Sequence, residues 1–177
     1  MPQSTQRPMR RKDRELSREE TLTVIRHTPH CVIATVDESG TPYATPITAV
    51  LFEGAVYFHS SSDVTGRRYQ NALQNDKVSI VWIGRGETAA DELPKDFSVN
   101  YASAIVEGRI SLVTDEGEKK RVAKAFCLRH VPQAGEEAID KYYAAGGKYV
   151  VFWKVTIDSL SGKARNKQGY FNHILAV

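Results

Sequence analysis

This chain of 177 residues has few cysteines and lacks any long apolar run. Its two cysteines, Cys31 and Cys127, are too few for a disulfide framework, and both lie among apolar residues, so we expect buried free thiols. No apolar run approaches the roughly 18 residues of a membrane helix, and the first residues lack the apolar stretch of a signal peptide. We therefore expect a cytoplasmic protein with no membrane partner.

Signatures of metal and nucleotide chemistry are also absent. The sequence contains no HxxxH, no CxxC and no carboxylate cluster, so we expect no dedicated metal site. It contains neither GxGxxG nor a P-loop, which argues against a Rossmann or Walker nucleotide site. No motif indicates a Ser/His/Asp triad.

The net charge of +3 comes from one short segment. Residues 1–15 carry five basic and two acidic side chains, whereas the rest of the chain carries 19 of each. A nucleic-acid-binding domain usually spreads basic charge over a folded face with aromatic residues between, so we expect no nucleic-acid partner. The segment is either a solvated arm or an arm that pairs with an anionic ligand or a partner subunit.

The expected elements predict an α+β fold that is mainly β. A capping-box pattern at Ser17–Glu20 predicts a helix from near Arg18. Residues 85–100 are predicted to form a long polar loop, and Gly108 a bend or bulge within a strand. Strands are expected at residues 30–36, 43–53, 55–60, 77–84, 101–113 and 148–158, and further helices at about 66–75, 115–129 and 136–145.

Six strands with hairpin spacing predict an antiparallel barrel with helices packed outside it. The length fits one domain with one core. We expect a basic N-terminal arm over residues 1–16, a ligand-binding domain over 17–163 and a C-terminal tail over 164–177.

The stretch VYFHSSSDVTGRRYQNALQNDKVSI, residues 56–80, predicts an anion site. An apolar strand ends at His59, serines follow, and Gly66 precedes a helix whose first turn holds Arg67 and Arg68. Cations in the first turn oppose the helix macrodipole, whereas a helix N-terminus with arginines and small hydroxyl side chains suits phosphate. A plain capped helix is the alternative interpretation.

Two further residues favour a ligand near this loop. Pro46 lies inside a strand, where it removes a backbone donor and leaves neighbouring groups free for a ligand; an edge strand beside solvent is the alternative. His59 follows a strand directly before the serines, so it is a candidate ligand-binding or catalytic residue. A satisfied core histidine is the other interpretation.

Several motifs recur in one order: MRRKDRE, GTPYATPI, a glycine-turned hairpin into VYFHS, G-x-R-x-x-x-x-L before NDKV, and LSGK. Together they resemble the nitroimidazole-resistance (Nim) branch of the pyridoxamine 5′-phosphate oxidase-like proteins, over residues 9–163. The resemblance implies a six-stranded split β-barrel, a homodimer, and FMN bound at the subunit interface. A short insertion between His59 and Gly66 departs from the family pattern.

The resemblance also assigns residues and an activity. It implies cofactor-binding residues in the phosphate loop (His59, Ser60, Ser61, Arg67 and Arg68), in the strand along the flavin edge (Thr45, Pro46, Ile47 and Thr48) and, from the other subunit, at Lys163. The implied activity is flavin-dependent reduction of a nitroaromatic or related small molecule, with His59 as the candidate proton donor. Vitamin B6 oxidation is the weaker interpretation, because the substrate-binding arginine and histidine motif near the C-terminus is absent. A haem- or deazaflavin-binding enzyme and a non-catalytic flavin-binding sensor stay open.

Overall fold

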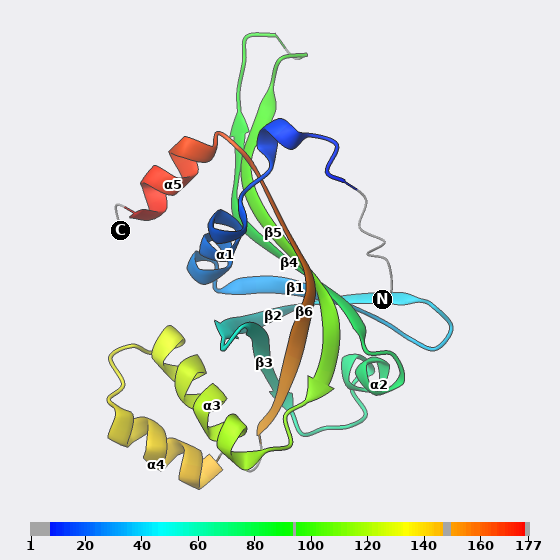
Figure 1. Ribbon diagram of the computed structural model, residues 1–177, viewed down its shortest axis with the longest axis vertical. Coiled ribbons are helices and arrows are strands. Elements are labelled where there is room, and N and C mark those ends of the chain that lie inside the picture. The colour runs from blue at the N-terminus through cyan, green and yellow to red at the C-terminus, as the bar shows by residue number, and fades with distance from the viewer. Residues whose placement is uncertain (1–7, 94, 147–149, 176–177) are drawn as a thin grey trace. The chain divides into compact units, whose positions relative to one another are not determined.

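The structure is a computed structural model that describes residues 8–93, 95–146 and 150–175 (Figure 1). Six strands form one sheet that closes into a barrel in the order β1-β2-β3-β6-β5-β4, which confirms the predicted antiparallel split-barrel fold with helices outside it. The strands are β1 (His30–Val36), β2 (Pro42–Phe52), β3 (Ala55–Ser61), β4 (Lys77–Ala89), β5 (Ser98–Leu112) and β6 (Val150–Arg165).

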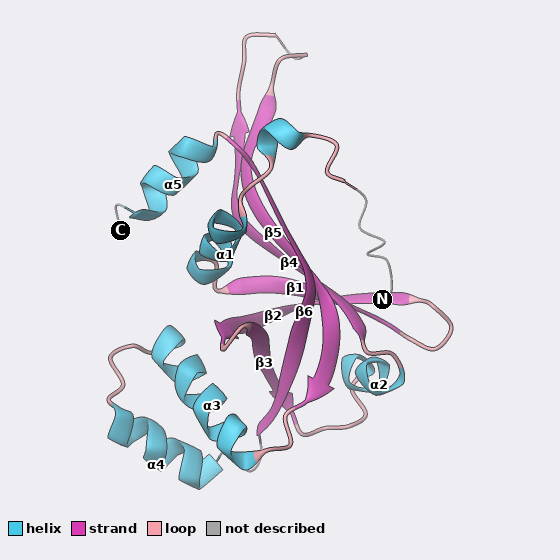
Figure 2. Ribbon diagram, in the orientation of Figure 1, coloured by secondary structure: helices cyan, strands magenta, loops and turns pink. Residues whose placement is uncertain are grey.

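The helices occur before, between and after these strands (Figure 2). They are η1 (Lys12–Arg14), α1 (Arg18–His27), α2 (Arg67–Gln74), α3 (Glu116–His130), α4 (Glu136–Gly146) and α5 (Lys167–Leu175). The predicted capping box forms at α1: the Glu20 amide donates to Ser17 Oγ at 3.2 Å, and the Ser17 amide donates to the Glu20 carboxylate at 2.8 Å. Within the described ranges, no helix has both the length and the apolar character needed to cross a bilayer.

The chain divides into two compact units. The first unit comprises the described parts of residues 1–28, 81–106 and 159–177, and the second comprises those of 29–80 and 107–158. Strands β4, β5 and β6 contribute residues to both. The predicted basic arm falls in the first unit, and its residues 1–7 lie outside the described part of the chain.

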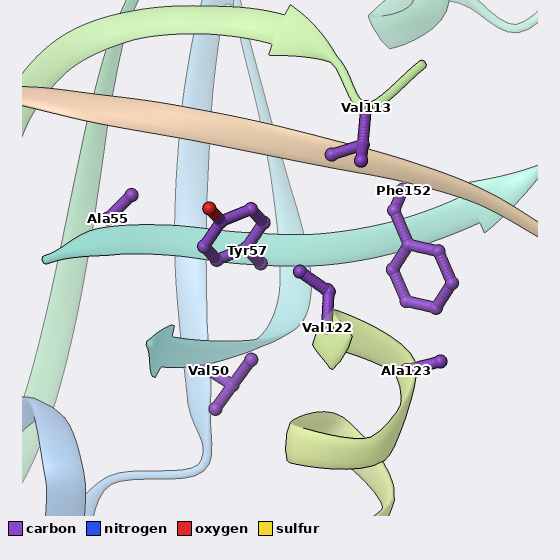
Figure 3. Close-up of a cluster of buried hydrophobic side chains, with 7 residues drawn as sticks. All are labelled: Val50, Ala55, Tyr57, Val113, Val122, Ala123 and Phe152. Carbon is purple, nitrogen blue, oxygen red and sulfur yellow. The ribbon is translucent and has the colours of Figure 1, made fainter. Parts of the chain in front are cut away.

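A hydrophobic cluster in the second unit joins α3 to strands β2, β3 and β6 (Figure 3). Val122 is fully buried, and burying a side chain of this size contributes about 1.5–3 kcal/mol. Tyr57 is also buried, and its hydroxyl donates to Glu118 at 2.8 Å, while Lys154 donates to the same carboxylate at 2.9 Å. The cluster consists of Val50, Ala55, Tyr57, Val113, Val122, Ala123 and Phe152.

The predicted polar loop at residues 85–100 was wrong at both ends. Strand β4 continues to Ala89 and β5 begins at Ser98. Arg85 and Glu87 stand two residues apart, hence on the same side of the strand, and form an ion pair there. The sheet ladder is made of backbone groups, so polar side chains on an exposed strand end do not prevent it.

Two glycines allow close backbone approaches, one in each unit. A Cβ on Gly108 would lie 2.1 Å from the Thr156 carbonyl oxygen, so β5 and β6 can pack here only around a glycine. A Cβ on Gly162 would lie 2.2 Å from Thr21 Oγ1. Strand β6 passes this point and reaches Arg165, beyond the predicted end at residue 158, and the Leu16 amide donates to the Gly162 carbonyl at 3.0 Å.

The two cysteines are free thiols, as expected. Cys31 is buried in β1, and desolvation raises the pKa of its thiol to about 12. Cys127 on α3 is only half-buried, so its predicted full burial was wrong.

Candidate functional site

Strand β3 ends in the serines that the sequence singled out. The Trp153 indole N–H donates to Ser60 Oγ at 2.9 Å, and the Ser60 hydroxyl donates to the Ser61 carbonyl at 3.0 Å. Ser61 Oγ accepts from the Asp63 amide at 2.9 Å. These bonds hold the chain in a defined path as it leaves the sheet for α2.

Helix α2 begins without a side-chain cap. Its N-cap residue is Gly66, which offers no side-chain acceptor, and its first turn contains no acidic residue. The first amides of a helix have no partner inside the helix, and they carry the positive end of its dipole. This helix start is therefore an electropositive group of backbone donors beside the serines.

Arg68 extends from this first turn across the sheet. Its Nη1 donates to Thr45 Oγ1 at 3.2 Å, and its guanidinium lies 5.4 Å from the centre of the Phe58 ring. Burial lowers the pKa of Arg68. Among the described residues, no carboxylate lies within ion-pair distance of it. A half-buried cation with no anionic partner is expected to bind an anionic ligand.

Arg68 lines two neighbouring cavities. The smaller, of about 200 Å³, lies against the strand end and the start of α2, and its walls are formed by Ser60, Ser61, Asp63, Gly66, Arg68, Tyr69 and Trp153. The larger, of about 320 Å³, lies along β2, and its walls are formed by His30, Pro46, Ile47, Thr48, His59 and Arg68. The first has the polar groups of a phosphate cradle, and the second has room for a flat ring system along a strand.

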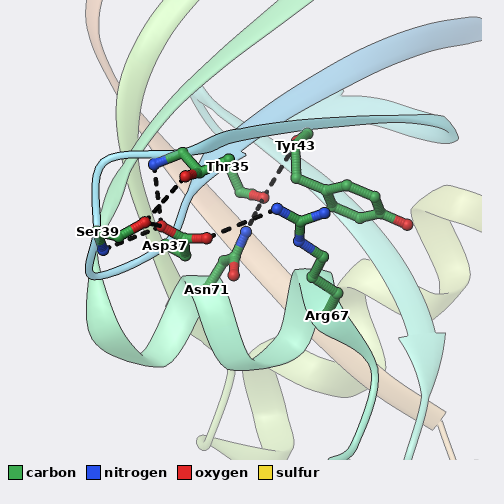
Figure 4. A network of polar contacts seen from close by, with 7 residues as sticks. Thr35, Asp37, Ser39, Tyr43, Arg67 and Asn71 are labelled. Carbon is green, nitrogen blue, oxygen red and sulfur yellow. Dashed lines mark hydrogen bonds and ion pairs between the residues drawn. The ribbon is translucent and has the colours of Figure 1, made fainter.

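Arg67 lies near Asp37, Tyr43 and Asn71 (Figure 4). Its guanidinium lies 3.6 Å from Asp37 Oδ2 and 4.6 Å from the centre of the Tyr43 ring. Asn71, one turn further along the helix, donates to Thr35 Oγ1 at 3.1 Å on the same side. Successive helical residues do not face each other, so only one of the two arginines reaches the cavities.

The stretch of β2 around Pro46 has one paired side. Residues 42–48 pair with β1, whereas in the described part of the chain β3 pairs only with Ala49–Phe52. Pro46 is exposed and faces the larger cavity together with Ile47 and Thr48. Pro46 thus lies on a segment paired on one side only, and its role in binding a ligand stays a prediction.

His59 lies where the larger cavity meets the helices. Its ring makes an edge contact with Phe126 on α3, with 4.8 Å between ring centres, and a tilted contact with Phe152 at 6.3 Å. Desolvation, followed by the charge of Arg68, lowers the pKa of His59. The imidazole is therefore neutral at pH 7, and it can donate or accept a hydrogen bond.

Lys163 belongs to the first unit, whereas the other predicted site residues belong to the second. Its ammonium lies 5.9 Å from the centre of the Tyr101 ring, and Arg14 Nη1 donates to the hydroxyl of the same tyrosine at 3.4 Å. Burial acts to raise the pKa of Tyr101, but hydrogen bonds from Arg14 and Lys163 bring it below its ordinary value. The approach of Lys163 to a flavin of a second subunit stays a prediction.

Sequence reasoning missed several wall residues. His30 faces Thr48 across the β1–β2 pair, with Nδ1 and Oγ1 3.3 Å apart, and counting back from the turn at residues 37–42 could have found it. Trp153 lies opposite Phe58 in the β3–β6 pair. No local signal pointed to it, because β6 is far from β3 in the sequence.

Comparison with known protein families identifies the family of this chain. Residues 17–164 match the family model described as pyridoxamine 5′-phosphate oxidase. The chain belongs to this family. The family prediction made from the ordered motifs is therefore confirmed.

Solved structures share the fold of this chain. A candidate 5-nitroimidazole antibiotic resistance protein from Bacteroides thetaiotaomicron superposes with a TM-score of 0.68 at 19% identity, over 84% of this chain and 85% of the other. The flavocytochrome Anf3 from Azotobacter vinelandii superposes with a TM-score of 0.72 at 18% identity, over 90% of this chain and 72% of the other. At these identities the likeness establishes the fold.

A curated relative is similar over part of its length only. It is the tRNA modification GTPase MnmE of Lachnoclostridium phytofermentans, 29% identical over 114 residues. The match covers 62% of this chain and 24% of that protein. The chain thus corresponds to about a quarter of this relative, whose name describes a much longer protein.

Proposed function

We propose that the protein is an FMN-dependent oxidoreductase that reduces nitroaromatic or related small molecules. The observation that carries this proposal is Arg68, a half-buried cation without a carboxylate partner that joins a phosphate-sized cavity to one along β2. The residues present fit a phosphorylated flavin. The uncapped start of α2, Ser61 and Arg68 would hold the phosphate, and Pro46 to Thr48 would line the ring system.

The protein's own groups would bind and orient the reactants. When bound, the flavin carries electrons from a donor to the substrate, and the polypeptide positions both. Backbone groups of β2 on its unpaired side would stabilise negative charge at the ring edge. His59 would present its N–H at the junction of the cofactor cavity and the helices.

The overall reaction balances with a reduced nicotinamide as donor. Conversion of a nitro group to a nitroso group requires two electrons and two protons and releases one water. The nicotinamide supplies a hydride, which is two electrons and one proton, and solvent supplies the second proton. The nicotinamide leaves in its oxidised form.

The similar structures support this proposal by what their names state. One is a candidate 5-nitroimidazole antibiotic resistance protein, and another is a flavocytochrome. A homodimer with the flavin at the subunit interface, approached by the partner's copy of the LSGK segment, is part of the proposal.

The deciding experiment is cofactor reconstitution followed by turnover. Purified protein should bind FMN with one-to-one stoichiometry, and cofactor released by heat should have the mass of FMN. The FMN-loaded protein should then oxidise a reduced nicotinamide in the presence of a nitroimidazole. Stoichiometric haem in place of flavin would overturn the cofactor assignment. FMN binding without reduction of any nitroaromatic by any donor would make the protein a flavin-binding sensor.

A further inference from the structure

A third cavity of about 370 Å³ lies beside His59 on the helical side of the second unit. Helices α3 and α4 form two of its walls, and the ends of β3 and β6 form a third. Its lining is mostly apolar and includes the rings of Phe126, Tyr142, Tyr143 and Phe152. This size and lining are typical of small-molecule sites, which combine an apolar wall with a few placed polar groups.

One polar atom in the wall lacks a partner. His130 Nε2 is shielded from solvent, and among the described residues nothing hydrogen-bonds to it. Because Nε2 has no accessible surface, a molecule in the cavity would touch other atoms of this ring and not this nitrogen. The ring of Phe126 stands between His130 and His59, with 4.6 Å and 4.8 Å between the respective ring centres.

The absence of charged side chains from the described walls of the cavity favours an uncharged occupant. Desolvation lowers the pKa of both His59 and His130, and the charges of Arg68 and Arg129 act on them in the same direction. Both imidazoles are therefore neutral at pH 7. No aspartate, glutamate, lysine or arginine lines the described walls, so neither a cation nor an anion would find a counter-charge there.

His59 lines both this cavity and the one along β2. The two cavities therefore adjoin at this side chain, so a molecule in the apolar cavity would lie next to the proposed flavin site. Tyrosine and phenylalanine rings favour a flat aromatic occupant, because aromatic rings stack or pack edge to face. The volume suits a small ring system with short substituents.

We propose that this cavity is the substrate pocket and that it takes uncharged planar aromatic molecules, which pack against its aromatic rings. That these molecules are substrates rests on the proposed function, whereas their binding does not.

The first test measures binding of 2-methyl-5-nitroimidazole by calorimetry, without and with FMN. Ala138→Phe places a ring into the cavity from α4, and it should weaken binding at least about 10-fold, since the apolar contacts would be lost. Ala144→Phe is the matched control, because Ala144 lies on the same helix but does not line the cavity. The affinity of this variant for the nitroimidazole should stay within about 3-fold of that of the parent. Equal affinities for both variants, or no binding by the parent, would overturn the proposal.

The second test concerns the charge of the occupant. The charged probe 4-nitrobenzoate should bind at least about 10-fold more weakly than 2-methyl-5-nitroimidazole, because the described walls hold no counter-charge. Binding of the uncharged probe should also shift the ¹⁵N resonances of the His59 and His130 rings, which line the cavity. Tight binding of 4-nitrobenzoate, or unchanged resonances of both rings, contradicts the proposal.

The two proposals can fail separately. Circular dichroism melts would establish that each variant folds, and FMN affinity would be measured on every variant. If FMN does not bind but the parent still binds the nitroimidazole and Ala138→Phe weakens that binding, the pocket stands and the flavin assignment falls. If FMN-loaded protein reduces the nitroimidazole and Ala138→Phe leaves KM unchanged, the pocket assignment falls and the proposed function stands.

Discussion

At the scale of single residues, the two adjacent arginines of α2 show how neighbours in sequence acquire different tasks. Arg67 packs on Tyr43 and pairs with Asp37, whereas Arg68 lies half-buried beside Thr45 without a carboxylate. A screened surface ion pair contributes little to stability. An unpaired cation beside two cavities is available to a phosphate group.

Replacing Arg68 should therefore affect FMN binding specifically. Arg68→Ala removes a charge-assisted interaction of about 1.5–3 kcal/mol, so FMN should bind about 10- to 100-fold more weakly. Riboflavin, which lacks the phosphate, should bind almost as before. Arg67→Ala is the matched control and should change FMN affinity less than about 3-fold. An equal loss for FMN and riboflavin would assign Arg68 to folding instead.

His59 poses a second question at this scale, whether it takes part in the chemistry or only in binding. General acid catalysis contributes about 10²- to 10⁴-fold, so His59→Ala should lower turnover by such a factor at saturating FMN and nitroimidazole. Flavin absorbance would report occupancy in the same sample. Full turnover at full occupancy would remove His59 from the reaction, and a loss of occupancy alone would assign it to cofactor binding.

At the scale of elements, close packing of strands and the burial of helix ends determine stability. Gly108 sits where β5 meets the carbonyl of Thr156, and no side chain can be accommodated without moving backbone. His130 lies in the last turn of helix α3, in the same unit. Burial, followed by the charge of Arg129, lowers the pKa of His130.

Gly108→Ala should lower the free energy of unfolding by about 1–3 kcal/mol, as overpacking does. Gly86→Ala is the matched control on β4, since a Cβ there meets nothing within 4 Å. The control should stay within about 1 kcal/mol of the parent. Urea denaturation of the cofactor-free protein measures both. Similar unfolding midpoints for the two variants would show that β6 shifts without cost.

The lowered histidine pKa values predict a stability change with pH. In the unfolded chain His59 and His130 titrate near their ordinary pKa of about 6.5, whereas in the folded state they take up protons only at lower pH. The unfolded state therefore binds more protons below pH 6.5, and the free energy of unfolding should fall as the pH falls from about 6.5 to 5. His130→Phe should flatten this decline in urea titrations. An unchanged slope would place the acid sensitivity elsewhere.

At the scale of the whole molecule, exposed apolar residues on strands of the first unit indicate a covered surface. Ile83 on β4 is 65% exposed, Val99 on β5 is 41% exposed and Ile105 on β5 is 37% exposed. Large apolar side chains that are exposed on strands favour burial by association. We expect a second copy of the chain to cover these three side chains.

We expect a homodimer in sedimentation, with twice the 19.8 kDa of one chain. Ile83→Asp places a charge on the proposed interface and should shift the protein toward monomer with loss of FMN affinity. Leu73→Asp, at an exposed site on α2, is the control and should leave the mass unchanged. A parent protein that is monomeric and binds FMN fully would contradict the dimer.

Local patterns in the sequence determined most of the elements of this protein and the start of the loop after β3. The capping box at Ser17, the turn at Asp37 and the strand that contains His59 depend on contacts within a few residues, so their chemistry is readable along the chain. The unpaired edge at Pro46 was foreseeable for the same reason, because proline removes a backbone donor wherever it stands.

Only the tertiary structure decided which residues meet. It separated Arg67 from Arg68, brought Trp153 to Ser60 across β3 and β6, and set His130 beside Phe126 in an apolar cavity. It also extended β4 and β5 into a segment of polar residues, because hydrogen bonds between the backbones of strands do not depend on an apolar side-chain pattern. Contacts between segments far apart in the chain depend on register and packing, which no local pattern encodes.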